Sequence, residues 1–238
     1  SKIQSKPAKG VQKMYFDATY LILIPAILFS LWAQSQVKNT YARYSKAFAG
    51  LTGEEAARMV LEMNGVTGVT IEPVAGELTD HFDPKTNTIR LSRGVYDVTS
   101  VAAVGVAAHE AGHAVQYAVG YSPIKIRTAI IPVTQIGSYL SWPLLLIGIL
   151  LGSDTLAMAG VLLFCAVVAF QLVTLPVEFN ASNRALEALG ASGYLKEEQL
   201  DGAGKVLRAA AMTYVAALAQ AVSQLLRLLL IANRNRRD

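Results

Sequence analysis

The sequence predicts a mainly α-helical, integral membrane protein with a small β element. Of the 238 residues, 53% are hydrophobic and only 16% are charged, whereas ordinary soluble domains are about 25% charged. Two long stretches, residues 129–152 and 155–177, contain no charged residue at all. Two short runs in the polar part of the chain, VTIEPV and NTIRLS, have the pattern of short strands.

The first thirteen residues, SKIQSKPAKGVQK, are not expected to belong to the fold. They hold four lysines and no acidic residue, while basic and acidic residues balance at seventeen each from Met14 onward. We interpret residues 1–13 as an added leader or a flexible tail, with a native basic arm as the alternative. The balance elsewhere predicts no nucleic-acid partner. The single cysteine, Cys165, excludes an intramolecular disulfide.

Three apolar segments are predicted to span a membrane. The first, Ala18 to Ala33, extends back to Phe16 and lacks an A-x-A cleavage pattern, so an uncleaved anchor is expected. The uncharged stretches on either side of Ser153 and Asp154 predict a tight transmembrane hairpin. A last segment, residues 209–226, contains polar residues and is expected either to span the membrane or to lie along its surface.

The polar part of the chain shows the boundaries of two helices. Thr52 and Glu55 form a capping-box pattern ahead of ARMVLEMNG, which predicts a short helix closed by Asn64 and Gly65. The segment DHFDPKTN between the two predicted strands is expected to be a turn. The run from Thr99 to Gly120 predicts a helix that is long enough to cross a membrane. Its many small residues would alternatively pack it into a compact core.

These elements predict seven regions along the chain. They are residues 1–13 (leader or tail), 14–34 (first transmembrane helix), 35–128 (catalytic domain), 129–152 and 153–177 (second and third transmembrane helices), 178–205 (a helix and loop), and 206–238 (a fourth transmembrane or interfacial helix with a basic tail).

The sequence HEAGH, His109 to His113, carries the chemistry of the chain. Histidines four residues apart project from one face of a helix and can bind one metal ion, and the pattern H-E-x-x-H is typical of zinc peptidases. Zinc lowers the pKa of a bound water toward about 7. Glu110 lies beside this site and is predicted to accept the proton of that water and pass it to the leaving amine. A structural helix without a metal is the alternative.

A third ligand has to come from elsewhere in the chain, and two acidic residues are candidates. Glu178 follows the third apolar segment directly. Because the chain crosses the membrane twice between His113 and Glu178, the hairpin returns Glu178 to the side of the HEAGH helix. Asp201 is the alternative, because it lies in the L-D-G pattern that site-2-type intramembrane proteases use, although its charged surroundings favour a surface turn.

The chain resembles the YugP-type membrane zinc metallopeptidases of bacteria. The matching stretches include FDATYLILIPAILFSLWAQ, GELTDHFDPKTNTIRLS, VAAVGVAAHEAGHAVQY, PVEFNASNRAL and LRAAAMTYVAAL. The segment EFNAS is also distantly similar to the E-x-x-A-D motif of HtpX and the CAAX prenyl proteases. This resemblance implies a zincin-like metal helix with Zn²⁺ bound by His109, His113 and Glu178. The chain has Ser182 where the distant group usually has aspartate.

Three further residues have weaker assignments. Zinc peptidases of this kind often place an edge strand beside the metal helix, where a peptide substrate adds as another strand. His81 lies near the predicted strand TIRLS and is a candidate to stabilise the oxyanion or compete as a ligand; a polar turn residue is the alternative. Arg184 is expected to orient a carboxylate or contact lipid headgroups, and Tyr214 to donate to an oxyanion or lie at the membrane interface.

The distribution of basic residues predicts the orientation in a bacterial inner membrane. They follow the first span and the hairpin, at Lys38, Arg43, Lys46, Arg58, Arg184, Lys196 and Lys205, whereas the hairpin tip carries only Asp154. The positive-inside rule then places the catalytic domain in the cytoplasm. The basic C-terminus disagrees, because a spanning last segment would put it outside.

Together these observations predict a multi-pass zinc endopeptidase that cleaves membrane proteins or peptides at the cytoplasmic membrane face. One alternative is an intramembrane protease that uses Asp201 as its third ligand. Another is a non-catalytic membrane scaffold with a vestigial metal site. The sequence indicates neither a cleavage preference nor a regulatory partner.

Overall fold

The computed structural model describes residues 18–235, so the prediction for residues 1–13 lies outside the described residues. The elements in chain order are η1 (Ala18–Leu23), α1 (Ile24–Tyr44), α2 (Gly53–Met63), β1 (Thr70–Val74), β2 (His81–Asp83), β3 (Thr88–Ser92), α3 (Val101–Ala118), α4 (Ser122–Leu150), α5 (Asp154–Ser192) and α6 (Glu197–Asn235). The fold is therefore mainly helical with one small sheet, as predicted.

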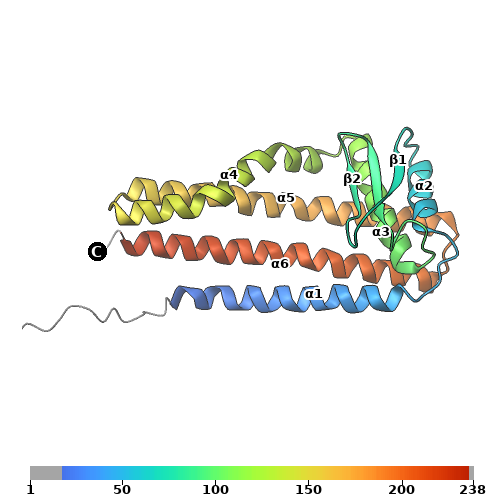
Figure 1. The fold of residues 1–238 in the computed structure, drawn as a ribbon, viewed down its shortest axis with the longest axis horizontal. Coiled ribbons are helices and arrows are strands. Elements are labelled where there is room, and N and C mark those ends of the chain that lie inside the picture. Colours follow the sequence, from blue (N-terminus) through green and yellow to red (C-terminus); the bar gives the residue numbers. More distant parts are fainter. Residues whose placement is uncertain (1–17, 236–238) are drawn as a thin grey trace, which may run out of the picture.

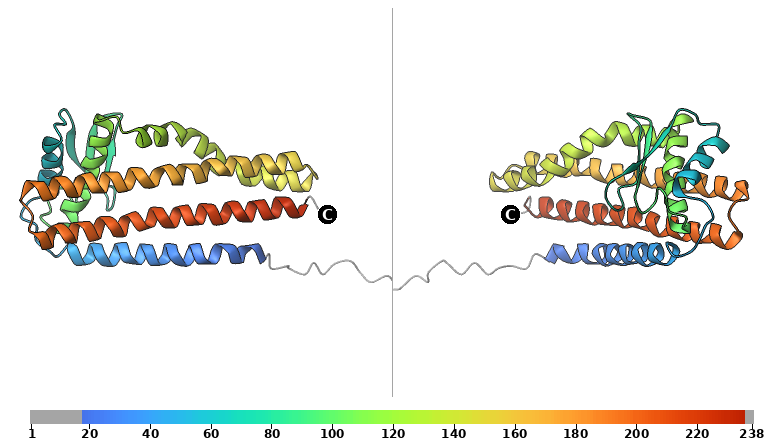
Figure 2. Two further views of the ribbon diagram at one scale, coloured as in Figure 1. Left: turned by 180° about the vertical axis from the view of Figure 1, so that it is seen from behind. Right: turned by 45° about the vertical axis from the view of Figure 1, so that its right-hand side comes forward.

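Four long helices form a bundle that defines the long axis of the molecule (Figure 1). Both further views show α1 beside α6 and α4 beside α5 (Figure 2). By length and composition, η1 with α1, α4, α5 and α6 are each apolar enough to cross a membrane. Successive long helices run in opposite directions, so the described chain begins and ends at the same end of the bundle (Figure 1).

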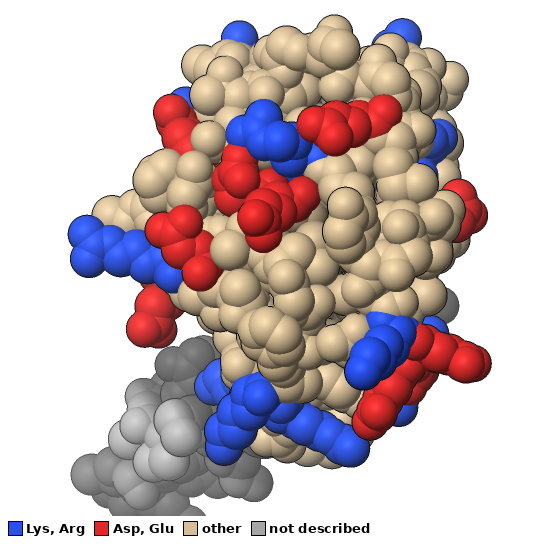
Figure 3. Space-filling view, turned by 90° about the vertical axis from the view of Figure 1, so that its right-hand side faces the viewer, with Lys and Arg blue, Asp and Glu red and all other residues tan. Residues whose placement is uncertain are grey.

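The two ends of the bundle differ in charge. At the end that holds both chain ends, uncharged stretches occupy residues 18–37, 128–150, 155–177 and 209–226. Each is about 20 residues long, which is the length that the hydrocarbon core of a bilayer requires. The opposite end carries α2, α3 and the sheet, and Figure 3 shows Lys, Arg, Asp and Glu gathered there. The molecule thus has an apolar bundle end and a polar domain.

The predicted hairpin is formed by α4 and α5, which approach each other closely through glycines. A Cβ atom added to Gly137, Gly148 or Gly160 would lie 2.4 to 2.5 Å from backbone atoms of the partner helix. Only glycine fits at these points, as is usual where helices pack tightly in membranes. Pro132 and Pro143 lie inside α4, which bends along its length in Figure 1 and carries its first turns toward β2.

The predicted capping box is present and starts α2. The Thr52 hydroxyl accepts a hydrogen bond from the Glu55 amide at 3.2 Å, and the Glu55 carboxylate accepts one from the Thr52 amide at 2.7 Å. The helix ends with Asn64 as its C-cap and Gly65 at a φ of +66°. The local sequence therefore determines both ends of this helix.

The sheet contains one strand more than predicted. Its order is β1-β3-β2, with β1 parallel and β2 antiparallel to β3. The segment expected to be only a turn contains β2, and His81 is its first residue. The strand TIRLS is the central β3, so the edge strand beside α3 is β2. Arg90 on β3 links the three strands, because its guanidinium bonds Glu72 of β1 at 2.8 Å and Asp83 of β2 at 3.1 Å.

The helix predicted from Thr99 to Gly120 is α3, and it lies in the core of the polar domain. Ser100 caps it by accepting a hydrogen bond from the Ala103 amide at 3.2 Å. Most of its small residues are fully buried against α2, α5 and α6. Of the two expectations for this helix, packing into a compact core is the correct one.

Two helices extend further than predicted. The third apolar segment and the Glu178 segment form the single helix α5 without a break. Asp201, which was expected in a surface turn, lies near the beginning of α6. The last apolar segment is part of this same 39-residue helix, which runs the length of the bundle.

Candidate metal centre

The close crossing of α3 and α5 brings the predicted ligands together. A Cβ atom on Gly112 would lie 2.4 Å from the backbone oxygen of Ala181 on α5, so only glycine permits this approach. His109 and His113 flank Gly112 on α3, one turn apart. Glu178 lies on α5 one turn before Ala181. The glycine of HEAGH therefore positions the histidines against the glutamate.

His109, His113 and Glu178 form a group whose ligand atoms all lie within 4.8 Å of one another. The Oε2 atom of Glu178 lies 3.2 Å from Nε2 of His109 and 3.5 Å from Nε2 of His113. The Glu178 side chain is almost completely buried, at 3% exposure. Two imidazoles and one carboxylate are a ligand set that catalytic zinc uses, with one position left open.

The hydrogen bonds of Gln116 determine the tautomer of His113. The Gln116 amide nitrogen donates to the backbone oxygen of Val177 at 2.8 Å and to Oδ1 of Asn180 at 3.0 Å. Its Oε1 atom therefore faces Nδ1 of His113 at 3.0 Å and has to accept that proton. Nε2 of His113 then carries a lone pair and is free to bind a metal.

Ser182 makes the corresponding contact to the other histidine. Its hydroxyl oxygen lies 3.0 Å from Nδ1 of His109, one turn after Glu178 on the same helix. A hydroxyl that accepts the Nδ1 proton leaves Nε2 of His109 free for a metal. Serine thus occupies a position from which it orients the histidine, where the distant relatives usually have aspartate.

Arg127 contacts the second oxygen of Glu178, and the sequence did not indicate this residue. Its guanidinium donates to Oε1 at 3.0 Å from the first part of α4. Arg184, which was expected to orient a carboxylate, instead donates to Asn180 at 2.8 Å. The only sequence indication for Arg127 is that it is the last charged residue before an uncharged stretch.

The three ligand atoms favour a cation between them. With Nδ1 of His113 protonated, its Nε2 and the Glu178 carboxylate both direct lone pairs to the same point. Burial of His113 opposes protonation of the ring, yet Glu178 and the nearby Glu110 carboxylate outweigh it and raise the pKa of His113. The donor set and its surroundings therefore fit Zn²⁺, a cation that binds neutral imidazole and carboxylate.

Glu110 lies beside the ligand group and faces open space. Within the part of the chain that the structure describes, no hydrogen bond or ion pair engages its carboxylate. Two cavities, of about 420 Å³ and 390 Å³, meet at this point. Both cavities are lined by Glu110, Tyr214, His109 and Glu178, and the second is also lined by His113. A group entering from either side therefore reaches the carboxylate and the ligand atoms together.

The two cavities have different walls. The first runs between α3 and α6 and is largely apolar, with Val106, Leu207 and Ala211 among its lining residues. The second runs between α3, α4 and β2, and His81 and Arg127 line it. Together they form a cleft that crosses the metal centre and follows the edge strand β2.

The remaining candidates lie outside the ligand group. His81 is exposed, and its Nδ1 atom bonds the backbone oxygen of Thr79 at 2.7 Å. Asp201 pairs with Lys205 at 2.6 Å and with Arg208 at 3.6 Å. It therefore does not converge with the two histidines, whereas Glu178 does.

A histidine pair that faces a buried glutamate on a crossing helix, in a bundle of apolar helices, is the arrangement expected of a membrane metallopeptidase. The chain belongs to the family described as "putative neutral zinc metallopeptidase", whose model matches residues 19–233. It is also 46% identical over 212 residues to "Putative membrane protease YugP" of Bacillus subtilis (strain 168), covering 88% of this chain and 94% of that protein. The YugP-type resemblance is thereby confirmed. No solved structure matches the chain.

Proposed function

We propose that the protein is a membrane-embedded zinc endopeptidase that hydrolyses peptide bonds of membrane-associated proteins or peptides. The observation that carries this proposal is the convergence of His109, His113 and Glu178 beside the unengaged carboxylate of Glu110. The family and the relative, both described as peptidases or proteases, support the same chemistry.

Each residue has a role that its position supports. His109, His113 and Glu178 would hold zinc, which when bound would polarise the scissile carbonyl and lower the pKa of a water. Glu110 accepts a proton from this water and transfers it to the leaving amine. Arg127 holds the Glu178 carboxylate in place. Tyr214, which lines both cavities, is positioned to donate a hydrogen bond to the developing oxyanion.

The substrate is proposed to bind as an extended chain along β2. One side of β2 pairs with β3, and the strand lies at the edge of the sheet beside α3. Residues of β2 line the same cavity as the ligands. A peptide that pairs with this edge runs past Glu110, in the zincin-like arrangement expected from the sequence. The largely apolar cavity between α3 and α6 favours an apolar side chain next to the cleaved bond.

The site is proposed to lie at the cytoplasmic face of a bacterial inner membrane. Arg127 and Glu178 are the first charged residues beyond the uncharged stretches of α4 and α5. Large apolar side chains along those stretches are exposed, Leu150 at 83% and Leu162 at 65%, as lipid-facing residues are. The metal centre would then lie at the boundary between the bilayer and the polar domain, within reach of segments that leave the membrane.

The first experiment separates an enzyme from a scaffold. The Glu110→Gln variant should retain zinc but lose peptide hydrolysis by about 10² to 10⁴-fold, because the general base is removed while the ligands remain. Zinc content and cleavage of a membrane-protein substrate in proteoliposomes measure the two properties. Equal cleavage by both zinc-loaded proteins would contradict the proposed role of Glu110 in catalysis. The absence of cleavage by the wild type would favour the non-catalytic scaffold.

The second experiment identifies the third ligand. Glu178→Ala should lose most bound zinc, whereas Asp201→Ala should retain it, because only Glu178 contacts both histidines. Zinc stoichiometry after purification with limiting zinc measures the difference. Full retention in Glu178→Ala, or loss in Asp201→Ala, would overturn the ligand assignment and favour the intramembrane alternative.

A further inference from the structure

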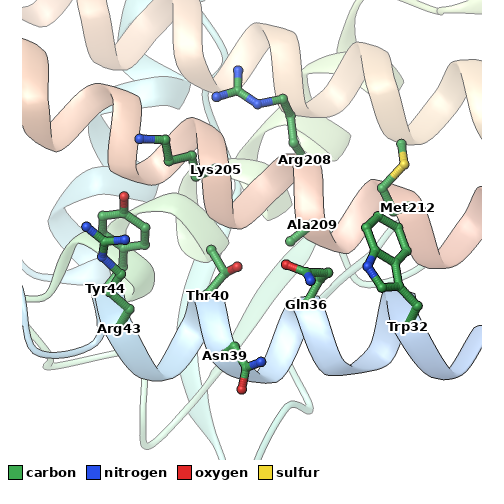
Figure 4. Close-up of a pocket in the computed structure, with 10 residues that line it drawn as sticks. All are labelled: Trp32, Gln36, Asn39, Thr40, Arg43, Tyr44, Lys205, Arg208, Ala209 and Met212. Atoms are coloured by element: carbon green, nitrogen blue, oxygen red, sulfur yellow. The ribbon is translucent and has the colours of Figure 1, made fainter.

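A second pocket lies on the opposite face of α6 from the metal centre. It has a volume of about 480 Å³ and is bounded by α1 and α6, so we call it the α1–α6 pocket (Figure 4). The α6 residues that line it are Lys205, Arg208, Ala209 and Met212. Other α6 residues, such as Val206 and Leu207, line the cavity at the metal centre, and they lie on the other face of the helix. The pocket is therefore separate from the proposed catalytic cleft.

The lining of this pocket changes from basic to apolar along its length. Figure 4 shows Arg43 and Lys205 toward one end, and Trp32 and Met212 toward the other. Arg208 adds a third basic group, and the side chains of Lys205 and Arg208 are 50% and 64% exposed. Asp201 is the acidic residue that pairs with these two. Among the described residues that line the pocket or pair with its basic groups, three positive charges therefore stand against the one carboxylate of Asp201, which leaves a net positive charge for a ligand.

The pocket lies across the boundary between the apolar bundle end and the polar domain. Lys38 on α1 and Arg208 on α6 are the first charged residues beyond the uncharged stretches. Trp32 and Met212 lie within those stretches, whereas Arg43 and Lys205 lie beyond them. In a bilayer, tryptophan favours the headgroup level, and basic pockets between membrane helices on the cytoplasmic side bind anionic headgroups.

We propose that the α1–α6 pocket binds an anionic phospholipid. The phosphodiester contacts Arg43, Lys205 and Arg208, and an acyl chain runs along Trp32 and Met212. A soluble phosphate would use only the basic end, so the apolar continuation of the pocket favours a lipid. This inference rests on the membrane insertion of the protein, and it is independent of the peptidase chemistry.

Lipid binding is tested with purified protein in detergent by native mass spectrometry, with phosphatidylglycerol and phosphatidylcholine added separately. Phosphatidylglycerol should bind more tightly than phosphatidylcholine. The combined variant Arg43→Gln, Lys205→Gln, Arg208→Gln should weaken phosphatidylglycerol binding by about fivefold for each charge, or on the order of a hundredfold in total. Equal binding of the two lipids, or unchanged binding in the variant, would overturn the proposal.

A matched control removes the same charge elsewhere. Arg58→Gln, Lys125→Gln, Lys196→Gln alters three exposed basic residues outside the pocket and should leave phosphatidylglycerol binding unchanged. If this control weakens binding as much as the pocket variant does, net charge alone attracts the lipid and the site does not exist.

Two further arms keep the test independent of folding defects and of catalysis. Asp201→Asn removes the competing carboxylate and should increase phosphatidylglycerol binding, a gain that a misfolded protein would not show. Glu110→Gln should bind the lipid like the wild type, so a failure of the proposed peptidase chemistry leaves this result untouched. Excess inorganic phosphate should not displace the lipid; displacement would identify a site for soluble phosphate and overturn the proposal.

Discussion

The residues behind the ligands determine which nitrogen of each histidine faces the metal centre. Gln116 donates two hydrogen bonds to α5, at Val177 and Asn180, and is thereby held with its oxygen toward His113. Arg184 donates to the same Asn180 oxygen. A buried network thus connects α5 to the His113 ring, and contacts of this kind fix ring orientation and raise ligand basicity.

Replacing Gln116 by leucine should lower zinc affinity by about 10- to 100-fold, because Nδ1 of His113 loses its acceptor and the ring loses its fixed tautomer. Competition with a chromophoric chelator measures the affinity. Gln220→Leu, on an exposed face of α6, is the matched control and should bind zinc like the wild type. Unchanged affinity in a folded Gln116→Leu protein would show that the network does not act on the metal.

The sequence indicated the members of the candidate metal centre whose pattern is local, and it missed the contacting residues that depend on tertiary structure. The spacing of His109 and His113 is a helical pattern, and the two membrane crossings gave a reason to choose Glu178. Arg127 reaches Glu178 across 51 positions, which no local pattern encodes. Gln116 had a weak local indication, because it follows His113 by three positions on an apolar helix.

Among the elements, the crossing of α3 and α5 has the strictest packing requirement. Gly112 lies against the Ala181 backbone at a distance that excludes any side chain. Gly105, two turns earlier on α3, instead meets the Cβ atom of Ala203 at 3.5 Å, which is ordinary contact. Gly112 is therefore the position to test, and Gly105 on the same helix is its control.

The Gly112→Ala variant should lower the free energy of unfolding by about 1–3 kcal/mol, because the added methyl group forces α3 and α5 apart. It should also lose zinc, since His113 moves away from Glu178. Gly105→Ala should be neutral or stabilising by up to about 1 kcal/mol, as expected for a helix interior. Unfolding followed by circular dichroism in detergent, with zinc analysis, measures both. Full zinc binding in Gly112→Ala would contradict the requirement for a close crossing.

The elements that were predicted well are those that their own sequence specifies. The predicted capping box of α2 is present, and α3, whose range was predicted, begins with a similarly local hydrogen bond to the Ser100 hydroxyl. The strand β2 was missed because its three residues become a strand only by pairing with β3, where Arg90 binds Asp83. The continuity of α6 was missed because the charged residues around Asp201 obscured a helix that packs against α1 and α5.

At the scale of the whole molecule, the points at which charged residues begin along the four long helices define one plane across the bundle. The uncharged stretches of all four long helices lie on one side of this plane, and the metal centre and the α1–α6 pocket lie at it. Arg227 is an exception within the apolar end; it is buried, donates to Thr19 at 3.2 Å and lies over the Tyr20 ring. Arg234 lies beyond Arg227, in the last turn of α6.

The proposed orientation predicts the labelling of single cysteines in a Cys165→Ala background. A membrane-impermeant maleimide should label Thr155→Cys, at the hairpin tip, in intact cells, because this end faces outward. Glu62→Cys, exposed on α2, should react only after lysis. The reverse pattern would place the metal centre outside the cell, and labelling of both positions in intact cells would contradict the crossing.

The edge of β2 determines the conformation of a chain that can bind there. It offers backbone hydrogen bonds only to an extended segment, whereas a membrane-spanning helix has already paired its N–H and C=O groups internally. Breaking those pairs within hydrocarbon costs several kcal/mol for each exposed group. A segment therefore becomes extended only after it has left the bilayer or lost its helical structure. In the proposed enzyme, the edge strand would thus spare intact membrane helices and accept chains that have unfolded.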